Sequence, residues 1–197
     1  MKIAIDIDGT IYDTEKNFRV QGEIYDIEEL NKNSVINPTA MWAQDRYNWT
    51  KEENEEYLKK FVDISKKSNL IPGAKEVIEK IQKLGIETII VTARGHESGE
   101  NNKEMIKIME EKMKQDGLSF DKYFWGTDDK SKICKQESID AIIDDSPIVC
   151  KQTSSAGIKT VFLHDSGIVG LEPNKNLIEV HNWGEVYREI LKIICKK

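Results

Sequence analysis

Along most of the chain, short and largely apolar runs alternate with longer stretches in which apolar residues recur every three or four positions. The short runs have the length of strands that are buried on both faces, and they lie at 3–5, 87–92, 123–125, 141–143 and 160–163. The longer stretches have the period of amphipathic helices, and the clearest are 74–84, 105–113 and 186–194. This alternation predicts an α/β fold, in which a parallel sheet carries helices on both faces.

The segment 17–70 interrupts the alternation. Polar turns and an aromatic-rich stretch come first, and a charged helix follows, with Thr50 and Glu53 spaced as a capping box at its start. We therefore expect two parts: a core formed by 1–16 and 71–197, and a small helical insert after the first strand. An insert at that place is well positioned to act as a lid over a ligand site.

Composition narrows the class of protein. The chain has 197 residues, of which 39% are hydrophobic, so it can bury a full core. Its formal net charge of −6 argues against a nucleic-acid polymer as partner. No apolar run approaches the ~18 residues of a membrane-spanning helix, so we expect no membrane partner. The three cysteines have no metal-like spacing, which favours a reducing compartment over a disulfide scaffold. The first strand and the aspartate motif begin so early that we expect no signal peptide. Both features favour a cytoplasmic protein.

Two aspartates, Asp6 and Asp8, follow the first predicted strand and run into a glycine turn at Gly9. Two carboxylates at the end of a buried strand destabilise a fold, because desolvated like charges repel each other. The pair makes sense if a divalent cation and an anionic substrate lie beside it. This motif is the strongest functional signal in the sequence.

Further polar residues follow the other predicted strands or precede the short helix before one of them. These residues are Thr92 and Arg94, which flank Ala93, then Lys130, then Asp144 and Asp145. The carboxyl ends of parallel strands meet at one edge of a sheet, which is where such sheets bind their ligands. We therefore expect these side chains to converge with the first aspartate pair.

Hydrolysis of a phosphate ester needs this set of groups. One carboxylate attacks phosphorus and a second carboxyl protonates the departing alkoxide. Mg²⁺, held by carboxylates and a backbone carbonyl, offsets the repulsion between the nucleophile and the phosphate. A hydroxyl, backbone N–H groups and a lysine hold the phosphoryl oxygens. We expect a phosphatase whose partner is a small-molecule phosphate ester.

The order and spacing of these motifs resemble the haloacid dehalogenase superfamily of phosphohydrolases. The resemblance covers 1–16 and 71–197, and it implies a five-stranded Rossmann-like sheet with the first strand in a central place and the insert as a helical cap. It also implies roles for individual residues. Asp6 would be the nucleophile and Asp8 the general acid and base.

The resemblance extends to the metal and the phosphate. It implies that Mg²⁺ is held by Asp6, by the backbone carbonyl of Asp8 and by Asp145, with Asp144 acting directly or through water. Phosphate would be bound at Thr92, Ala93 and Arg94 and by a lysine.

Three lysines precede the strand that ends in the second aspartate pair: Lys130, Lys132 and Lys135. Lys130 fits best, because it lies at the entrance of the short helix and can point toward the carboxyl ends of the strands. Lys132 is the main alternative, and Lys135 remains open.

At a finer level the chain is similar to the 5′-nucleotidase type C branch, the deoxyribonucleotidases. The shared features are the stretches 91–94 and 143–147, the small helical cap and the tail at 180–186. In that branch, aromatic side chains of the cap stack on a nucleobase. The candidates for this role here are Phe18, Trp42, Tyr47 and Trp49.

Several alternatives remain open from the sequence. A sugar-phosphate phosphatase, another metabolite phosphatase or a phosphomutase would need the same core residues. Two more distant alternatives are a relative that binds a phosphorylated ligand without catalysis and a receiver-like switch that accepts phosphate on aspartate. The receiver alternative fits less well, because receivers carry their acid pair and their acceptor on different strands and have no cap.

Overall fold

The computed structural model describes residues 1–40, 42–95, 100–164 and 171–195. In this part of the chain, six parallel strands form one sheet in the order β3-β2-β1-β4-β5-β6. The strands are β1 (Lys2–Ile5), β2 (Glu87–Val91), β3 (Lys122–Phe124), β4 (Ala141–Asp144), β5 (Lys159–Leu163) and β6 (Leu177–Val180). The predicted α/β fold with a parallel sheet is confirmed.

The expectation of five strands was wrong by one strand. The additional strand, β6, lies at the edge of the sheet and pairs only with β5. Its residues are less buried than those of the other long strands, and Glu179 faces outward in the middle of it. An edge strand of this kind lacks the continuous apolar run that marks a strand buried on both faces.

Strand β1 lies between β2 and β4, as the resemblance implied. Ile5, its last residue, pairs with Ile90 of β2 and with Ile143 of β4. The residues of these three strands are almost all buried, which explains their uninterrupted apolar character. As a result, the residue that follows Ile5 emerges in the interior of the sheet's carboxyl edge, flanked by two neighbouring strands.

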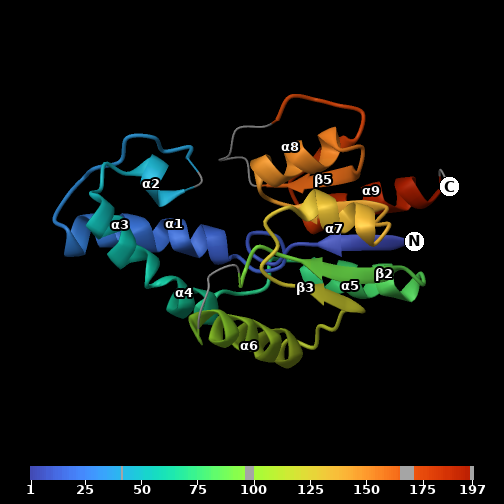
Figure 1. The fold of residues 1–197 in the computed structure, drawn as a ribbon, viewed down its shortest axis with the longest axis horizontal. Helices are drawn as coiled ribbons and strands as arrows, with labels where there is room; N and C mark the ends of the chain where they lie inside the picture. Colours follow the sequence, from blue (N-terminus) through green and yellow to red (C-terminus); the bar gives the residue numbers. More distant parts are fainter. Residues whose placement is uncertain (41, 96–99, 165–170, 196–197) are drawn as a thin grey trace.

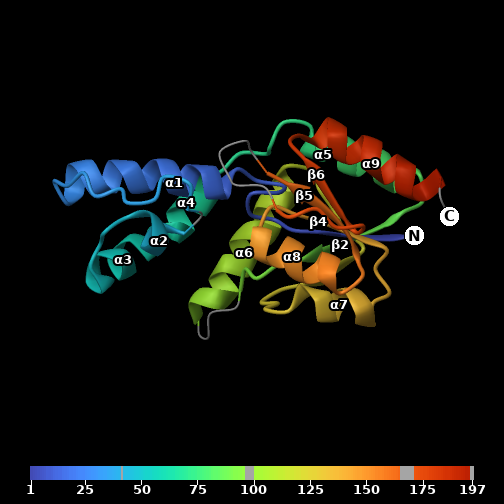
Figure 2. The same ribbon diagram turned by 90° about the horizontal axis from the view of Figure 1, so that it is seen from above.

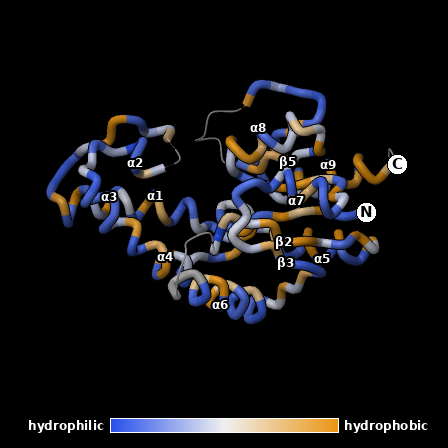
Figure 3. Tube along the Cα trace, in the orientation of Figure 1, coloured by the Kyte–Doolittle hydropathy of each residue, from blue (hydrophilic) through white to orange (hydrophobic). Residues whose placement is uncertain are grey.

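Helices cover both faces of the sheet (Figure 2). One face packs against α5 (Ala74–Lys83), α6 (Glu100–Gln115) and α9 (Trp183–Cys195). The other face packs against α7 (Lys130–Gln136) and α8 (Pro147–Ser155). Helix α6 shows both hydrophobic and hydrophilic colours along its length, as expected for a helix with one packed and one solvated face (Figure 3).

The remaining helices lie together to one side of the sheet (Figure 1). They are α1 (Thr14–Ile24), the π-helix η1 (Tyr25–Glu29), α2 (Ala43–Arg46), α3 (Lys51–Leu58) and α4 (Phe61–Lys67). We call this group the helical segment. It has a core of its own, rich in aromatic residues, and the predicted capping box of Thr50 and Glu53 begins α3. Within the described residues, no helix combines the length and the apolar character needed to cross a membrane.

Candidate active site

The loop that follows β1 is held tightly against the rest of the core. The backbone N–H of Asp6 donates to the carbonyl of Ile143, and the indole N–H of Trp183 donates to the carbonyl of Thr10, at 3.0 and 2.9 Å. Gly9 makes the turn possible, because its φ of +71° lies in the left-handed region that L-residues rarely adopt. The first aspartates are therefore presented by a fixed backbone.

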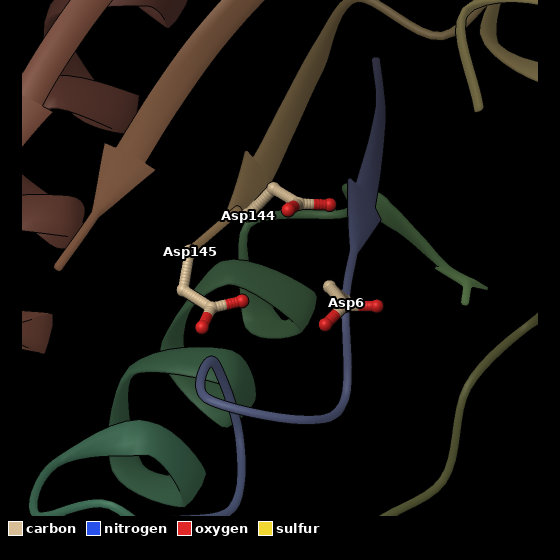
Figure 4. A group of neighbouring side chains, drawn as sticks. All are labelled: Asp6, Asp144 and Asp145. Atoms are coloured by element: carbon tan, nitrogen blue, oxygen red, sulfur yellow. The ribbon is translucent and has the colours of Figure 1, made fainter. Parts of the chain in front are cut away.

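Three buried carboxylates converge where β1 and β4 end. Oxygen atoms of Asp6, Asp144 and Asp145 lie within 4.8 Å of one another (Figure 4). Burial raises the pKa of Asp6 to about 7, against the attraction of Lys130 and with further repulsion from Asp144. Burial also raises the pKa of Asp145 well above its ordinary value, with repulsion from Asp6 adding to the effect. The cluster is therefore rich in negative charge and costly to hold without a cation.

Lys130 supplies one positive charge to this cluster. Its ammonium lies 2.6 Å from Oδ1 of Asp6 and 2.7 Å from Oδ2 of Asp144. Burial alone would lower the pKa of Lys130, but Asp144 and Asp6 together raise it, so the side chain stays charged. Lys132 and Lys135 are exposed on the same helix. Of the three lysines weighed from the sequence, the structure brings Lys130 to the aspartates.

The cluster fits a divalent cation. With all groups ionised, three carboxylates and one ammonium leave an excess of negative charge, and hard cations take carboxylate oxygens as ligands. The carboxylate of Asp145 lies directly against the backbone at Gly9, where an added β-carbon would come within 1.9 Å of Oδ2. The absence of a side chain at Gly9 is thus what gives Asp145 its place in the cluster.

Asp8 is oriented differently from the other aspartates. Its carboxylate accepts two hydrogen bonds from the guanidinium of Arg94, from Nε at 2.9 Å and from Nη2. Arg94 Nη2 also donates to the hydroxyl of Ser65 at 3.2 Å, and the guanidinium lies over the ring of Phe61. Arg94 therefore joins the core to helix α4 of the helical segment.

A cavity of about 490 Å³ opens above the cluster. Every core residue that the sequence singled out for the site contributes to its lining: Asp6, Asp8, Thr92, Ala93, Arg94, Lys130, Asp144 and Asp145. The hydroxyl of Thr92 is buried and accepts a hydrogen bond from the backbone N–H of Arg94 at 3.1 Å. The predicted convergence of these residues at the carboxyl edge of the sheet is thus what the structure shows.

The aromatic residues of the helical segment are divided between the cavity and the segment's own core. Trp42 lines the cavity, whereas the structure does not bring Phe18, Tyr47 or Trp49 to it. Tyr47 stacks on Trp49 with ring centroids 4.1 Å apart, and Phe18 packs 4.5 Å from the ring of Tyr57. These three rings pack in the core of the helical segment, because a unit of this size needs large aromatic side chains to form a core.

Six further lining residues were missed from the sequence: Glu15, Phe61, Gly95, Met105, Ser146 and Val149. Glu15 is the most notable, since burial raises its pKa to about 8 and the nearby Asp8 and Asp6 add to the rise. Glu15 lies in the first turn of α1, the helix that follows the Asp6 loop, and this position could have indicated that Glu15 belongs to the site. For the apolar residues Phe61, Met105 and Val149, nothing in the sequence distinguishes a residue that lines a cavity from one that packs in a core.

Comparison with known proteins agrees with the fold and the motifs. Residues 3–144 match the profile of the family described as haloacid dehalogenase-like hydrolase. No curated protein with significant sequence similarity was found.

Solved structures share the fold at low sequence identity. A predicted phosphatase from Clostridium acetobutylicum is 13% identical, with a TM-score of 0.64 over 97% of this chain and 98% of that one. A protein from Bacteroides vulgatus, provisionally described as a β-phosphoglucomutase, is 15% identical, with a TM-score of 0.60 over 98% of this chain and 88% of that one. The family profile spans most of the chain, and the chain therefore belongs to the haloacid dehalogenase-like hydrolases.

Proposed function

We propose that the protein is a Mg²⁺-dependent phosphomonoesterase that acts on a small-molecule phosphate ester. One observation carries the proposal: Asp6, Asp144, Asp145 and Lys130 meet, buried, on the floor of a cavity at the carboxyl ends of β1 and β4. This arrangement provides a nucleophile, a cation site and a fixed positive charge within reach of one bound phosphate. The structural neighbour described as a phosphatase supports the same reaction class.

Two steps account for the chemistry. A carboxylate oxygen of Asp6 attacks phosphorus and the bond from phosphorus to the ester oxygen breaks, while Asp8 gives a proton to the departing alcohol. This step leaves phosphate on Asp6. Water then attacks the phosphorus of this intermediate, Asp8 takes the proton from that water, and phosphate leaves with the Asp6 carboxylate restored.

Phosphoryl oxygens need donors during both steps. We assign this role to the hydroxyl of Thr92, the backbone N–H of Ala93 and the ammonium of Lys130, which belong to three residues that line the cavity. Arg94 can add its Nη1, which has no hydrogen-bond partner among the described residues. Fixed donors of this kind stabilise the charge that develops on the transferred group.

Asp6, Asp145 and the backbone carbonyl of Asp8 would hold Mg²⁺, and Asp144 would support it directly or through water. When bound, the ion supplies positive charge that offsets the repulsion between the carboxylate nucleophile and the phosphate dianion. The fit rests on the buried carboxylate cluster and on the close approach of Asp145 to Gly9.

For the substrate we propose a nucleoside monophosphate, as in the 5′-nucleotidase type C branch. Trp42 and Phe61 line the cavity together with the apolar Met105, so a planar base would find flat, apolar surfaces beside the phosphate site. A cavity of about 490 Å³ is in the range that small organic ligands occupy. In this proposal the cap that selects the substrate is the insert at 17–70, which contains most of the helical segment.

A sugar-phosphate phosphatase or a phosphomutase is the second candidate, and the likeness to the structure described as a β-phosphoglucomutase favours it. Such an enzyme would use the same core residues and differ in what the cavity accepts. We place either activity in the cytoplasm, in line with the free cysteines Cys134, Cys150 and Cys195.

The test is a phosphate-release screen with Mg²⁺ over 5′- and 3′-nucleoside monophosphates and sugar phosphates, with Asp6→Asn as the blank. We expect turnover of at least one nucleotide and none in the blank. Turnover of a hexose phosphate with no nucleotide accepted would replace the nucleotidase proposal by the second candidate. Conversion of one hexose phosphate into its isomer would indicate a mutase. If no phosphate ester is consumed, a non-catalytic or receiver-like protein is the better description. If Asp6→Asn keeps full activity, Asp6 is not the nucleophile and the proposed mechanism fails.

A further inference from the structure

We propose that Arg94 is a positioning residue for Asp8, and that it makes the orientation of this acid depend on helix α4. The proposal rests on the proposed function, in which Asp8 moves the proton of the leaving group. It assigns to the guanidinium a task that differs from binding phosphate.

The contact with Asp8 uses two of the five N–H donors of the guanidinium. Nε and Nη2 of Arg94 each donate to a different oxygen of the carboxylate, so the pair has the two-pronged geometry that fixes both the distance and the plane of a carboxylate. The side chain of Arg94 is fully buried, and that of Asp8 is 14% exposed. An Asp8 held in this way cannot rotate freely about its side-chain bonds.

The other side of the guanidinium rests on the helical segment. Nη2 donates to the hydroxyl of Ser65, which itself donates to the carbonyl of Phe61 one turn earlier in α4. The ring of Phe61 lies with its centroid 5.3 Å from Cζ of Arg94, a distance at which a cation is attracted to a ring face. Helix α4 thus supplies two of the contacts that hold the guanidinium in place.

The backbone of Arg94 belongs to the core. Its N–H donates to the hydroxyl of Thr92 at 3.1 Å, and its carbonyl accepts from the N–H of Gly126 at 2.8 Å. The side chain therefore spans from the carboxyl end of β2 to α4, with Asp8 held between them. A shift of α4 would remove the hydroxyl and the ring from Arg94, and the hold on Asp8 would loosen.

A positioning role and a phosphate-binding role predict different dependences on the leaving group. Loss of a correctly placed acid harms substrates with poor leaving groups and spares those whose alcohol leaves without a proton. Loss of a phosphate contact harms both classes equally. The comparison uses two aryl phosphates of similar shape, phenyl phosphate and 4-nitrophenyl phosphate, since 4-nitrophenolate leaves without protonation and phenolate does not.

The experiment measures kcat/KM for both substrates in the wild type, Arg94→Ala, Arg94→Lys, Ser65→Ala, Asp8→Asn and the double variant of Arg94→Ala with Asp8→Asn. This constant reports the steps up to release of the alcohol, so slow hydrolysis of the phosphorylated enzyme does not mask the effect. The ratio of the two constants within one preparation is independent of how much of the variant is folded.

We expect Arg94→Ala to lower kcat/KM for phenyl phosphate about tenfold more than for 4-nitrophenyl phosphate, and Asp8→Asn to show the same selectivity. Arg94→Ala should add little further loss of selectivity in the Asp8→Asn background, because both changes remove one function. Arg94→Lys should rescue only in part, since an ammonium cannot hold both carboxylate oxygens. Ser65→Ala should show a smaller selectivity of the same sign.

Equal losses on both substrates, or additive losses of selectivity in the double variant, would overturn the proposal and return Arg94 to phosphate binding. If Arg94→Ala altered the ratio and Ser65→Ala left it unchanged, Arg94 would still position Asp8, but the dependence on α4 would be overturned. Failure of the proposed function looks different. In that case the wild type fails to consume either aryl phosphate, or Asp6→Asn remains as active as the wild type.

Discussion

A β-carbon added to Gly9 would lie 1.9 Å from Oδ2 of Asp145 and 2.5 Å from its carboxyl carbon. The backbone of the loop after β1 is thus in contact with the carboxylate at the end of β4, although 136 positions separate the two residues in the sequence. Gly9 is needed for two independent reasons, its positive φ and this contact, and the two can be separated by experiment.

Gly9→Ala should abolish tight Mg²⁺ binding, because the new methyl group displaces Asp145 from the cluster. Gly85→Ala is the matched control, since Gly85 has a φ of +73° but no atom within 4 Å of an added β-carbon. Both variants should lose about 1–2 kcal/mol of unfolding free energy from backbone strain. Isothermal titration with Mg²⁺ should show the loss of tight binding in Gly9→Ala alone. Unchanged affinity in Gly9→Ala would remove Asp145 from the proposed metal ligands.

Lys130→Met should be both inactive and unstable. The substitution keeps the length of the side chain but leaves the buried Asp6 and Asp144 without their shared ammonium, which costs about 3–5 kcal/mol in chelator. Lys132→Met, on the exposed face of the same helix, is the control and should change neither property. Chemical unfolding in EDTA and phosphate release with Mg²⁺ measure the two effects. A larger loss of activity in Lys132→Met would show that the wrong lysine was assigned to phosphate.

The stability of the metal-free protein should fall as pH rises from about 4 to about 7. Burial raises the pKa of Asp6 from 3.8 to about 7, so in this window the unfolded chain gives up a proton that the folded chain keeps. Mg²⁺ competes with that proton, and its binding should therefore strengthen as pH rises through the same window. Thermal unfolding should show a larger stabilisation by Mg²⁺ at pH 8 than at pH 5.5.

Asp6→Asn provides the control for this pH dependence, because it removes the titrating group. In chelator, the variant should be more stable than the wild type at pH 7, and the difference should shrink toward pH 4. A wild type whose response to Mg²⁺ is the same at both pH values would contradict the assignment of Asp6 as the group that exchanges a proton for the metal.

Asp26 should be the main polar support of the helical segment. Its buried carboxylate accepts hydrogen bonds from the backbone N–H of Ser34 at 2.8 Å and from the indole N–H of Trp49 at 2.7 Å, as well as from the hydroxyl of Ser34. Burial alone would raise the pKa of Asp26, but these hydrogen bonds lower it, so the carboxylate is stabilising at neutral pH. Asp26→Ala leaves buried donors without a partner and should cost about 2–3 kcal/mol.

Hydrogen exchange is the suitable measurement for Asp26→Ala, because it locates the loss. Exchange should accelerate in η1 and α3 and remain slow in β1 and β4. Asp63→Ala is the control in the same segment. Asp63 is exposed and pairs with Lys66 at 3.6 Å, so its loss should cost only a few tenths of a kcal/mol. Acceleration throughout the sheet would show that the segment and the core unfold as one unit.

The sequence predicted the core of the sheet because burial on both faces leaves an unmistakable apolar run, as in β1 and β4. It predicted the convergence of Asp6 and Asp145 because residues that follow parallel strands meet at one edge. Strand β6 was missed since an edge strand that carries Glu179 lacks that run. Phe18 and Phe61 could not be told apart, because their environment depends on how α1 and α4 pack. The Asp8–Arg94 pair joins residues 86 positions apart, a distance at which no local pattern carries information.

The place of β1 between β2 and β4 has a consequence for biosynthesis. Strand β1 leaves the ribosome before both of its neighbours, and it is completed only when the segments around residues 87–91 and 141–144 have been made. At the usual pace of translation that wait is on the order of ten seconds. During this wait the nascent chain exposes the apolar stretch that ends at Asp6, so chaperones have time to engage this stretch before the cavity forms.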